Sequence, residues 1–221
     1  PATGCWPSND GDPDWDSVRL LIQSDSTGEG DGNFFDSSKH DHSIGSAGDA
    51  IHLYDKNIAK FDKSCMAFNG NGWLTIQDSD VNMWGWQKSQ PFTIETWFKL
   101  DSWPSSGSWA VEGAWLWDVA SCGVRVETSG NIWVEAWGEE GTYFGEYVGA
   151  KQRVENMGGY DAWHHLAIVH EGDNVMKCYL NGVEGSTEIK NFSGDINKTM
   201  KQWIASGYYG SQPAIVKLEE F

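Results

Sequence analysis

FTIETWFKL, from Phe92 to Leu100, largely alternates between apolar and polar residues. Successive side chains of a β-strand point to opposite faces, so this alternation predicts one face in a core and one face outside it. The face expected in the core carries Phe92, Ile94, Thr96, Phe98 and Leu100. The opposite face carries Thr93, Glu95, Trp97 and Lys99. The stretch therefore predicts a strand that packs against a core on one side.

Two further pairs of strand-like runs follow along the chain. Residues 124–127 and 132–137 predict a hairpin whose turn contains Gly130. Residues 163–170 and 175–180 form the second pair, joined by a short polar connection. Such signals recur about every ten to fifteen residues, and no stretch has a convincing helical period. This spacing is typical of a sandwich or barrel of antiparallel strands.

The ends of the chain differ in composition from its middle. Residues 1–16 are rich in Pro, Asp, Asn and Gly, and we expect them to form a leader or linker. Residues 17–221 are expected to form one domain, with a first strand at 18–22 and a last strand at 215–221. The one helical turn that the sequence predicts lies at 79–83.

The net charge limits the classes of partner. The 221 residues contain 15 Lys and Arg against 32 Asp and Glu, a formal charge of −17. Such a chain repels nucleic acids and anionic lipid surfaces, so a nucleic-acid partner is not expected. No run reaches the roughly 18 to 20 apolar residues that span a bilayer, so membrane insertion is not expected either.

The four cysteines have no CxxC spacing, which disfavours a zinc ribbon and leaves any disulfide pairing open. They are Cys5, Cys65, Cys122 and Cys178. Cys178 alternates with Met176 and Leu180, and is expected to remain a free, small apolar residue in the core.

Several segments resemble laminin-G-like jelly-roll domains of the concanavalin A-like lectin/glucanase superfamily, as found in bacteriophage and bacterial surface proteins. The sequences WHHLAIV at 163–169 and CYLNGV at 178–183 are similar to the family's "WHHVAVV" and "LYVNGV" strands. Residues 68–76 and 91–97 resemble "FDGxGDYLTI" and "DFTIEFW". The ending LEEF at 218–221 resembles "IDEFRI", cut before its last residues.

The resemblance implies an all-β fold, an antiparallel two-sheet jelly-roll sandwich of the concanavalin A-like kind. It also implies a non-catalytic carbohydrate-binding or adhesion module on a virion or extracellular surface, with a glycan or cell-surface polysaccharide as its partner. The alternative is a structural decoration or spacer domain that contacts other subunits of a phage or cell-surface assembly. A polysaccharide-degrading enzyme of the same fold is less favoured, because fold alone does not decide function.

Calcium is the first candidate cofactor. The resemblance implies a site that joins the end of the first strand to the last strand, formed here by Asp25, Asp36 and Glu219. Glu219 stands where the family more often has Asp. Oxygen donors from loops suit calcium, which takes six to eight of them. The alternative is that these are ordinary solvated loop acids.

The chain departs from the family pattern in its aromatic middle, residues 103–147. There Trp133 and Trp137 flank Glu135 on one face of a strand, and Trp115 and Trp117 form a second pair on one face. Flat indole rings can pack against the apolar faces of sugar rings while polar neighbours bind the hydroxyls. The predicted ligand-binding residues are Trp115, Trp117, Trp133, Glu135, Trp137 and Tyr143. The alternative is that these Trp side chains belong to the core.

No catalytic residues are assigned. Glycosidases of this fold place their carboxyl groups on one strand as ExDxxE, and the sequence has no such string. Glu135 has no acidic residue two positions along the chain, and Glu139, four positions along, lies beyond the predicted strand at 132–137.

Overall fold

The computed structural model describes residues 14–24, 30–61, 63–76, 90–102, 113–119, 122–128, 130–137, 143–148, 159–172, 175–185, 202–207, 214–219 and 221. For residues 113, 119, 136–137 and 143–148 the description covers the backbone only.

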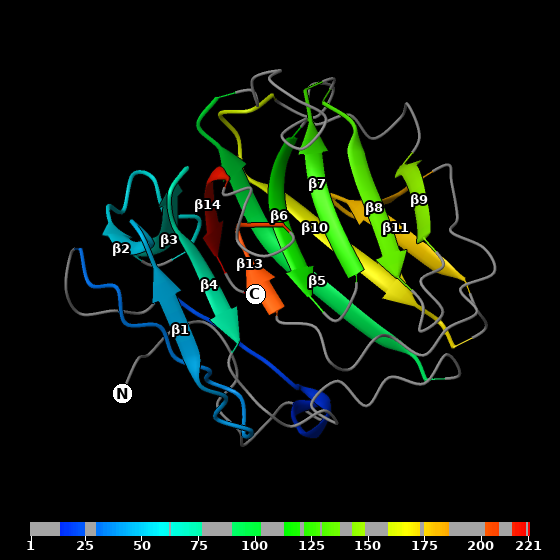
Figure 1. Ribbon diagram of the computed structural model, residues 1–221, viewed down its shortest axis with the longest axis horizontal. Coiled ribbons are helices and arrows are strands. Elements are labelled where there is room, and N and C mark those ends of the chain that lie inside the picture. The colour runs from blue at the N-terminus through cyan, green and yellow to red at the C-terminus, as the bar shows by residue number, and fades with distance from the viewer. Residues whose placement is uncertain are drawn as a thin grey trace.

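Among the described residues, two seven-stranded sheets, in which every strand pairing is antiparallel, lie one in front of the other (Figure 1). The front sheet consists, in spatial order, of β1 (Ile44–Ala47), β4 (Trp73–Ile76), β13 (Gln202–Ile204), β6 (Gly113–Val119), β7 (Cys122–Glu127), β8 (Ile132–Trp137) and β9 (Tyr143–Val148). The back sheet consists of β12 (Val183–Glu184), β11 (Met176–Leu180), β10 (His164–His170), β5 (Phe92–Leu100), β14 (Ile215–Glu219), β3 (Ser64–Asn69) and β2 (Ile51–Tyr54). The all-β, two-sheet jelly-roll prediction is confirmed.

Helical structure within the described part of the chain is limited to η1, a 3-10 turn at Trp15–Ser17. No helix among these residues is long and apolar enough to cross a bilayer. The predicted helical turn at 79–83 and nearly all of the predicted leader lie outside the described residues.

One hydrophobic core fills the space between the sheets. β5 contributes Ile94, Phe98 and Leu100, which are all nearly inaccessible to solvent, while Phe92 packs against the edge of the core. Leu166 of β10 and Leu180 of β11 belong to the same core. The alternation of FTIETWFKL therefore predicted correctly which face of β5 is buried.

The predicted strand pairs are also confirmed. β7 and β8 form the expected hairpin, and Gly130 in its turn adopts a φ of 76°, which favours glycine. β10 pairs with β11 in the register Leu166 to Leu180. Cys178 is buried in the core and free, as are Cys65 and Cys122, whereas Cys5 lies outside the described residues.

The first strand predicted at 18–22 is reduced to a single bridge between Ile22 and Asp36. The backbone groups of this segment have several different partners instead of one neighbouring strand. Leu21 donates its N–H to the Asp36 carboxylate at 2.9 Å, and Ile22 exchanges two backbone hydrogen bonds with Phe221. The prediction of a regular strand was wrong, because its backbone bonds are shared between a side chain and the far end of the chain.

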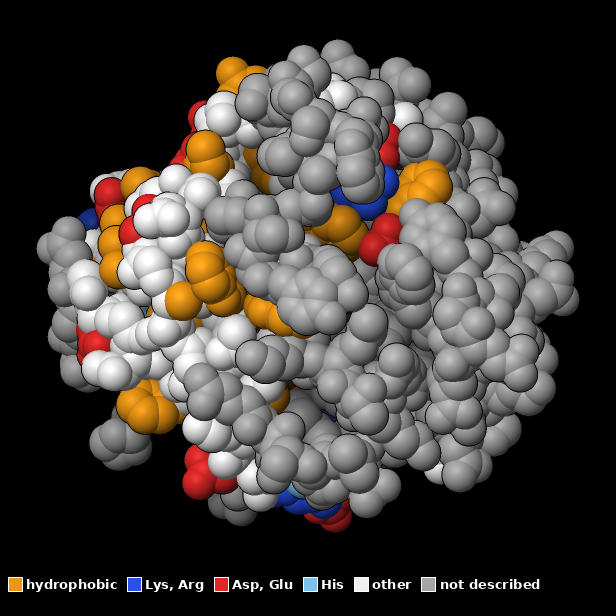
Figure 2. Space-filling view, in the orientation of Figure 1, with side chains coloured by type: hydrophobic (Ala, Val, Ile, Leu, Met, Phe, Trp, Pro, Cys, Tyr) orange, Lys and Arg blue, Asp and Glu red, His pale blue; other side chains and the backbone are white. Residues whose placement is uncertain are grey.

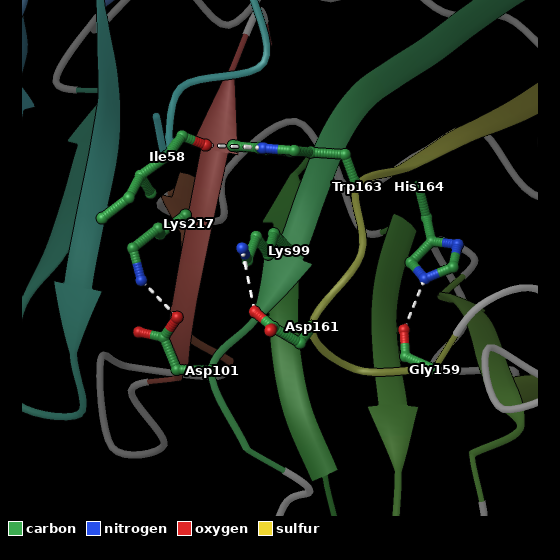
Figure 3. A network of polar contacts seen from close by, with 8 residues as sticks. All are labelled: Ile58, Lys99, Asp101, Gly159, Asp161, Trp163, His164 and Lys217. Atoms are coloured by element: carbon green, nitrogen blue, oxygen red, sulfur yellow. Dashed lines mark hydrogen bonds and ion pairs between the residues drawn. The ribbon is translucent and has the colours of Figure 1, made fainter. Parts of the chain in front are cut away.

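Polar contacts tie loops to the outer face of the back sheet (Figure 3). The contacts drawn there include Trp163 Nε1 to the Ile58 carbonyl at 2.7 Å, Lys99 to Asp161 at 2.9 Å, and the ion pair of Lys217 with Asp101. These three contacts hold loops against the back sheet. The outer face of the front sheet carries a different arrangement.

Candidate functional site

β7 directs charged residues to the outer face of the front sheet. Its side chains alternate, so Val124 and Val126 enter the core and are fully buried. Arg125 and Glu127 therefore point away from the core. Since β7 lies in the interior of the front sheet, these two charged residues have strands on both sides.

Arg125 lies between two indole rings. Its partners in the strand register are Trp115 on β6 and Trp133 on β8. The guanidinium carbon is 5.2 Å from the centroid of the Trp115 ring and 5.0 Å from that of the Trp133 ring. Both distances fit cation–π contacts, which strengthen when the groups are shielded from water. Three adjacent strands thus form one cross-strand row with a cation at its centre.

Two carboxylates hold the same guanidinium. Arg125 Nη2 lies 3.3 Å from Glu127 Oε1, and Nη1 lies 3.3 Å from Glu135 Oε2. Trp133 Nε1 also donates a hydrogen bond to Glu135 Oε2, at 3.0 Å. The side chains of Glu127 and Glu135 are only 9% and 8% exposed. Arg125 Nε is buried and has no hydrogen-bond partner among the described residues.

Figure 2 shows basic, acidic and apolar side chains close together at the upper right. Arg125 has 18% of its side chain exposed, and Trp133 is partly exposed. We call Trp115, Arg125, Glu127, Trp133 and Glu135 the Arg125 cluster.

A second cross-strand row runs beside the first. Asp118 on β6, Gly123 on β7 and Glu135 on β8 are register partners. A Cβ atom at Gly123 would lie 2.7 Å from Trp115 Cζ3 and 3.0 Å from Glu135 Cγ, so glycine provides the space into which both side chains lean. Burial, together with the negative charge of Glu135, raises the pKa of Asp118 to about 7.

Trp115 is the most deeply buried aromatic residue of the cluster. It is 6% exposed, although it lies on the outer face. A Cβ atom at Gly207 would lie 2.6 Å from Trp115 Cε2, so the backbone after β13 packs directly on the indole ring. Trp115 therefore supports Arg125 from below rather than offering its own ring to a ligand.

A β-bulge separates Trp115 from Trp117. The register places Trp115 opposite Arg125 and Trp117 opposite Val124, which leaves Leu116 as an extra residue. Trp117 is fully buried in the core and contacts Phe221 edge-on, with ring centroids 5.6 Å apart. The prediction that Trp117 shares the ligand-binding face of Trp115 was therefore wrong, because the bulge interrupts the alternation.

The other predicted site residues have mixed outcomes. The structure brings Trp115, Trp133 and Glu135 together in the Arg125 cluster. Trp137 and Tyr143 are register partners on β8 and β9, but their side chains lie outside the described part of the structure.

Sequence reasoning missed Arg125, Glu127 and Asp118. For Arg125 and Glu127 the signal was available, since Val124 and Val126 alternate with them in a predicted hairpin strand. Asp118 could not be found by alternation, because the bulge at Leu116 moves it to the outer face.

Of the predicted calcium ligands, Asp36 has a dense set of hydrogen bonds. Its Oδ1 accepts from the N–H groups of Leu21 and Ser38 at 2.9 and 2.8 Å. Its Oδ2 accepts from the Ser38 hydroxyl at 2.8 Å and the His42 N–H at 2.9 Å. This carboxylate organises the loop that follows it.

Glu219 accepts hydrogen bonds from two backbone N–H groups, those of Lys60 at 2.7 Å and Phe61 at 3.1 Å. Asp25 lies outside the described residues. Within the described part of the chain no group of three His, Cys, Asp or Glu side chains is placed to hold a metal ion. The calcium site at Asp25, Asp36 and Glu219 stays a prediction.

Comparison of the sequence with protein families agrees with this fold. A laminin-G family model, described as the concanavalin A-like lectin/glucanases superfamily, matches residues 68–221. The chain belongs to this superfamily. The resemblance noted in the sequence is thereby confirmed, and the superfamily match includes all of β5 to β14. No curated protein sequence matches the chain.

Solved structures similar to this superfamily member include the binding domain of Paraclostridial mosquitocidal protein 1, with a TM-score of 0.69, 13% identity, and coverage of 94% of this chain and 48% of that one. A structure of botulinum neurotoxin type C, whose cell entry depends on two ganglioside molecules, has a TM-score of 0.64 and 16% identity, with coverage of 94% of this chain and 47% of that one. The binding domain of botulinum neurotoxin DC in complex with rat synaptotagmin II has a TM-score of 0.65 and 15% identity, with coverage of 94% of this chain and 48% of that one. At such identities the likeness concerns the fold, and the chain spans about half of each of these proteins.

Proposed function

We propose that this chain is a non-catalytic carbohydrate-binding module that acts in adhesion at a virion or extracellular surface. The Arg125 cluster on the outer face of the front sheet is the proposed binding site. One observation carries the proposal: Arg125 is fixed between two indole rings and two carboxylates on a sheet face directed away from the core. The sandwich core does not require such an arrangement.

The chemistry of the cluster suits a sugar. Trp133 presents a partly exposed ring, and flat aromatic rings pack well against the apolar C–H faces of pyranoses. Glu135 supplies carboxylate oxygens that accept hydrogen bonds from hydroxyl groups. The Arg125 side chain is 18% exposed and adds N–H donors beside this ring. A stacking surface with adjacent donors and acceptors is what recognition of a sugar requires.

The geometry favours binding over hydrolysis. Glycoside hydrolases use a pair of carboxyl groups that flank the scissile bond. Here Glu135 accepts hydrogen bonds from both Arg125 and Trp133 and is 6% exposed, while Asp118 is 8% exposed. A scissile bond has to fit between two carboxyl groups, and carboxyl groups that are so covered leave no room for it, whereas the small exposed part of Glu135 suffices to accept a hydrogen bond from a hydroxyl group.

The comparisons support this proposal at the level of the fold. The superfamily description names lectins, and the similar structures include binding domains. Two of the similar proteins engage cell-surface molecules, gangliosides in one case and synaptotagmin II in the other. These ligands belong to those proteins, and they support a cell-surface role for this chain.

A glycan array tests the proposal, followed by a matched pair of variants. We expect the full chain to bind at least one oligosaccharide, and Trp133→Ala to weaken that binding by at least about tenfold, as for a hot-spot aromatic. Trp97→Ala is the control, since Trp97 is a partly exposed indole on the outer face of the back sheet and should leave binding unchanged. Binding to no glycan, or equal losses in both variants, would contradict the proposal and favour a decoration or spacer role.

A further inference from the structure

We infer that the Arg125 cluster selects uncharged glycans and excludes glycans that carry carboxylate or sulfate groups. This inference rests on the proposed function and specifies its ligand class. It follows from the way in which the one cation of the cluster is neutralised.

Arginine is the residue that most often binds anionic groups, because its planar guanidinium presents paired N–H donors. In this cluster both ends of the guanidinium are occupied. Nη1 lies against Glu135 and Nη2 against Glu127. The two indole rings cover its faces from Trp115 and Trp133. A ligand carboxylate would have to displace one of these internal acids to gain a paired contact.

The charge of the cluster is negative. One guanidinium and two carboxylates leave a net charge of −1, and ionised Asp118 in the adjacent row adds a further negative charge. Arg125 is the only Lys or Arg in the seven described strands of the front sheet. Because Glu127 and Glu135 are largely shielded from solvent, water and salt screen their charges weakly. An approaching anion is therefore repelled, and no other Lys or Arg in the described strands of this sheet offsets the repulsion.

The hydrogen-bonding inventory points to the same ligands. The cluster is rich in acceptors, the carboxylate oxygens of Glu127 and Glu135. Its donors are largely used, since Trp133 Nε1 donates to Glu135 and the Nη atoms of Arg125 contact the two acids. Sugar hydroxyls both donate and accept, whereas a carboxylate or sulfate group only accepts. A neutral sugar can therefore satisfy this surface, and an acidic one cannot.

The first test compares neutral and acidic forms of the same oligosaccharide. The full chain is applied to an array that carries each neutral oligosaccharide beside its sialylated and uronate-bearing counterparts, and dissociation constants are then measured for the strongest pair. We expect the neutral form to bind at least about tenfold more tightly, since like charges at a binding surface are strongly unfavourable. Equal or tighter binding of the acidic form overturns the inference and leaves the proposed function standing. Binding of neither form overturns the proposed function itself.

Charge variants provide the second test. Glu135→Gln and Glu127→Gln each remove one negative charge from the cluster with little change of shape. Glu95→Gln is the matched control, because Glu95 lies on the back sheet and its side chain is 56% exposed. We expect each cluster variant that melts cooperatively to reduce the ratio of the dissociation constants of the acidic and neutral ligands severalfold, and the control to leave this ratio unchanged. A ratio that stays constant in both cluster variants, or falls as much in Glu95→Gln, overturns the inference.

Discussion

Asp118 and Glu135 lie on either side of Gly123 in one cross-strand row. Because glycine has no side chain, nothing on β7 separates the two carboxyl-bearing side chains at this position. The pKa of Asp118 is raised from 3.8 to about 7, first by burial and then by the charge of Glu135. At neutral pH Asp118 is therefore only partly ionised. The stability of the protein is linked to this ionisation.

The first prediction concerns pH and stability. A carboxyl whose pKa is higher in the folded state binds its proton more tightly there, so the free energy of unfolding falls as pH rises from about 4 to about 7. Asp118→Asn should remove this penalty and therefore stabilise the protein more at pH 8 than at pH 5. Urea unfolding at both pH values measures it. Asp161→Asn, at an exposed carboxylate that pairs with Lys99, is the control and should leave the difference in stability between the two pH values nearly unchanged.

The second prediction concerns the buried ion pairs. Arg125→Gln leaves the carboxylates of Glu127 and Glu135 shielded from water without their cation, and should lower the free energy of unfolding by about 3 to 5 kcal/mol. Adding Glu135→Gln to Arg125→Gln should recover part of the loss. A double-mutant cycle with denaturant unfolding isolates this coupling. Strictly additive losses would show that the two side chains are not energetically paired.

The third prediction separates the two kinds of Trp. Trp117→Ala opens a cavity in the core and should cost about 3 to 5 kcal/mol of stability. Trp133→Ala removes a partly exposed ring and one hydrogen bond to Glu135, and should cost only about 1 to 2 kcal/mol. Chemical denaturation of both variants measures the difference. Similar losses at the two positions would place Trp133 among the structural residues.

The fourth prediction addresses calcium. If Asp25, Asp36 and Glu219 hold the ion, a chelator should lower the melting temperature, by an amount equivalent to about 2.7 kcal/mol when calcium is a hundredfold above its Kd. Asp36→Asn should cost about 1 to 3 kcal/mol in any case, because an amide nitrogen would face the donors of Ser38 or His42. The variant should also lose its response to chelator. A wild-type melt that is unchanged in excess chelator removes calcium from this site.

The sequence predicted those parts of the fold that depend on local pattern. β5 alternates strictly enough that Ile94 and Phe98 could be assigned to the core, and the β7–β8 hairpin follows from two short runs around a glycine turn. The first strand at 18–22 could not be excluded in this way, because the bonds of Ile22 to Phe221 join residues from the two ends of the domain.

The candidate site was only partly predictable for the same reason. Trp133 and Glu135 were found because they lie two residues apart on one strand. The position of Arg125 between Trp115 and Trp133 depends on the register of three strands, which no single run of sequence encodes. Trp117 lies in the core and Asp118 on the outer face, the reverse of what simple alternation from Trp115 predicts, because Leu116 is an extra residue in β6.

The bulge at Leu116 also determines how this domain should be compared with its relatives. In a relative whose equivalent of β6 lacks the bulge, a gapless alignment would match Trp117 to a residue of the outer face and Asp118 to a residue of the core. Substitution patterns inferred from such an alignment would mix two unrelated selective pressures, one on ligand contact and one on packing. The presence or absence of this one residue therefore affects function by itself, because it decides which of the following side chains lie on the outer face even when their sequence is unchanged.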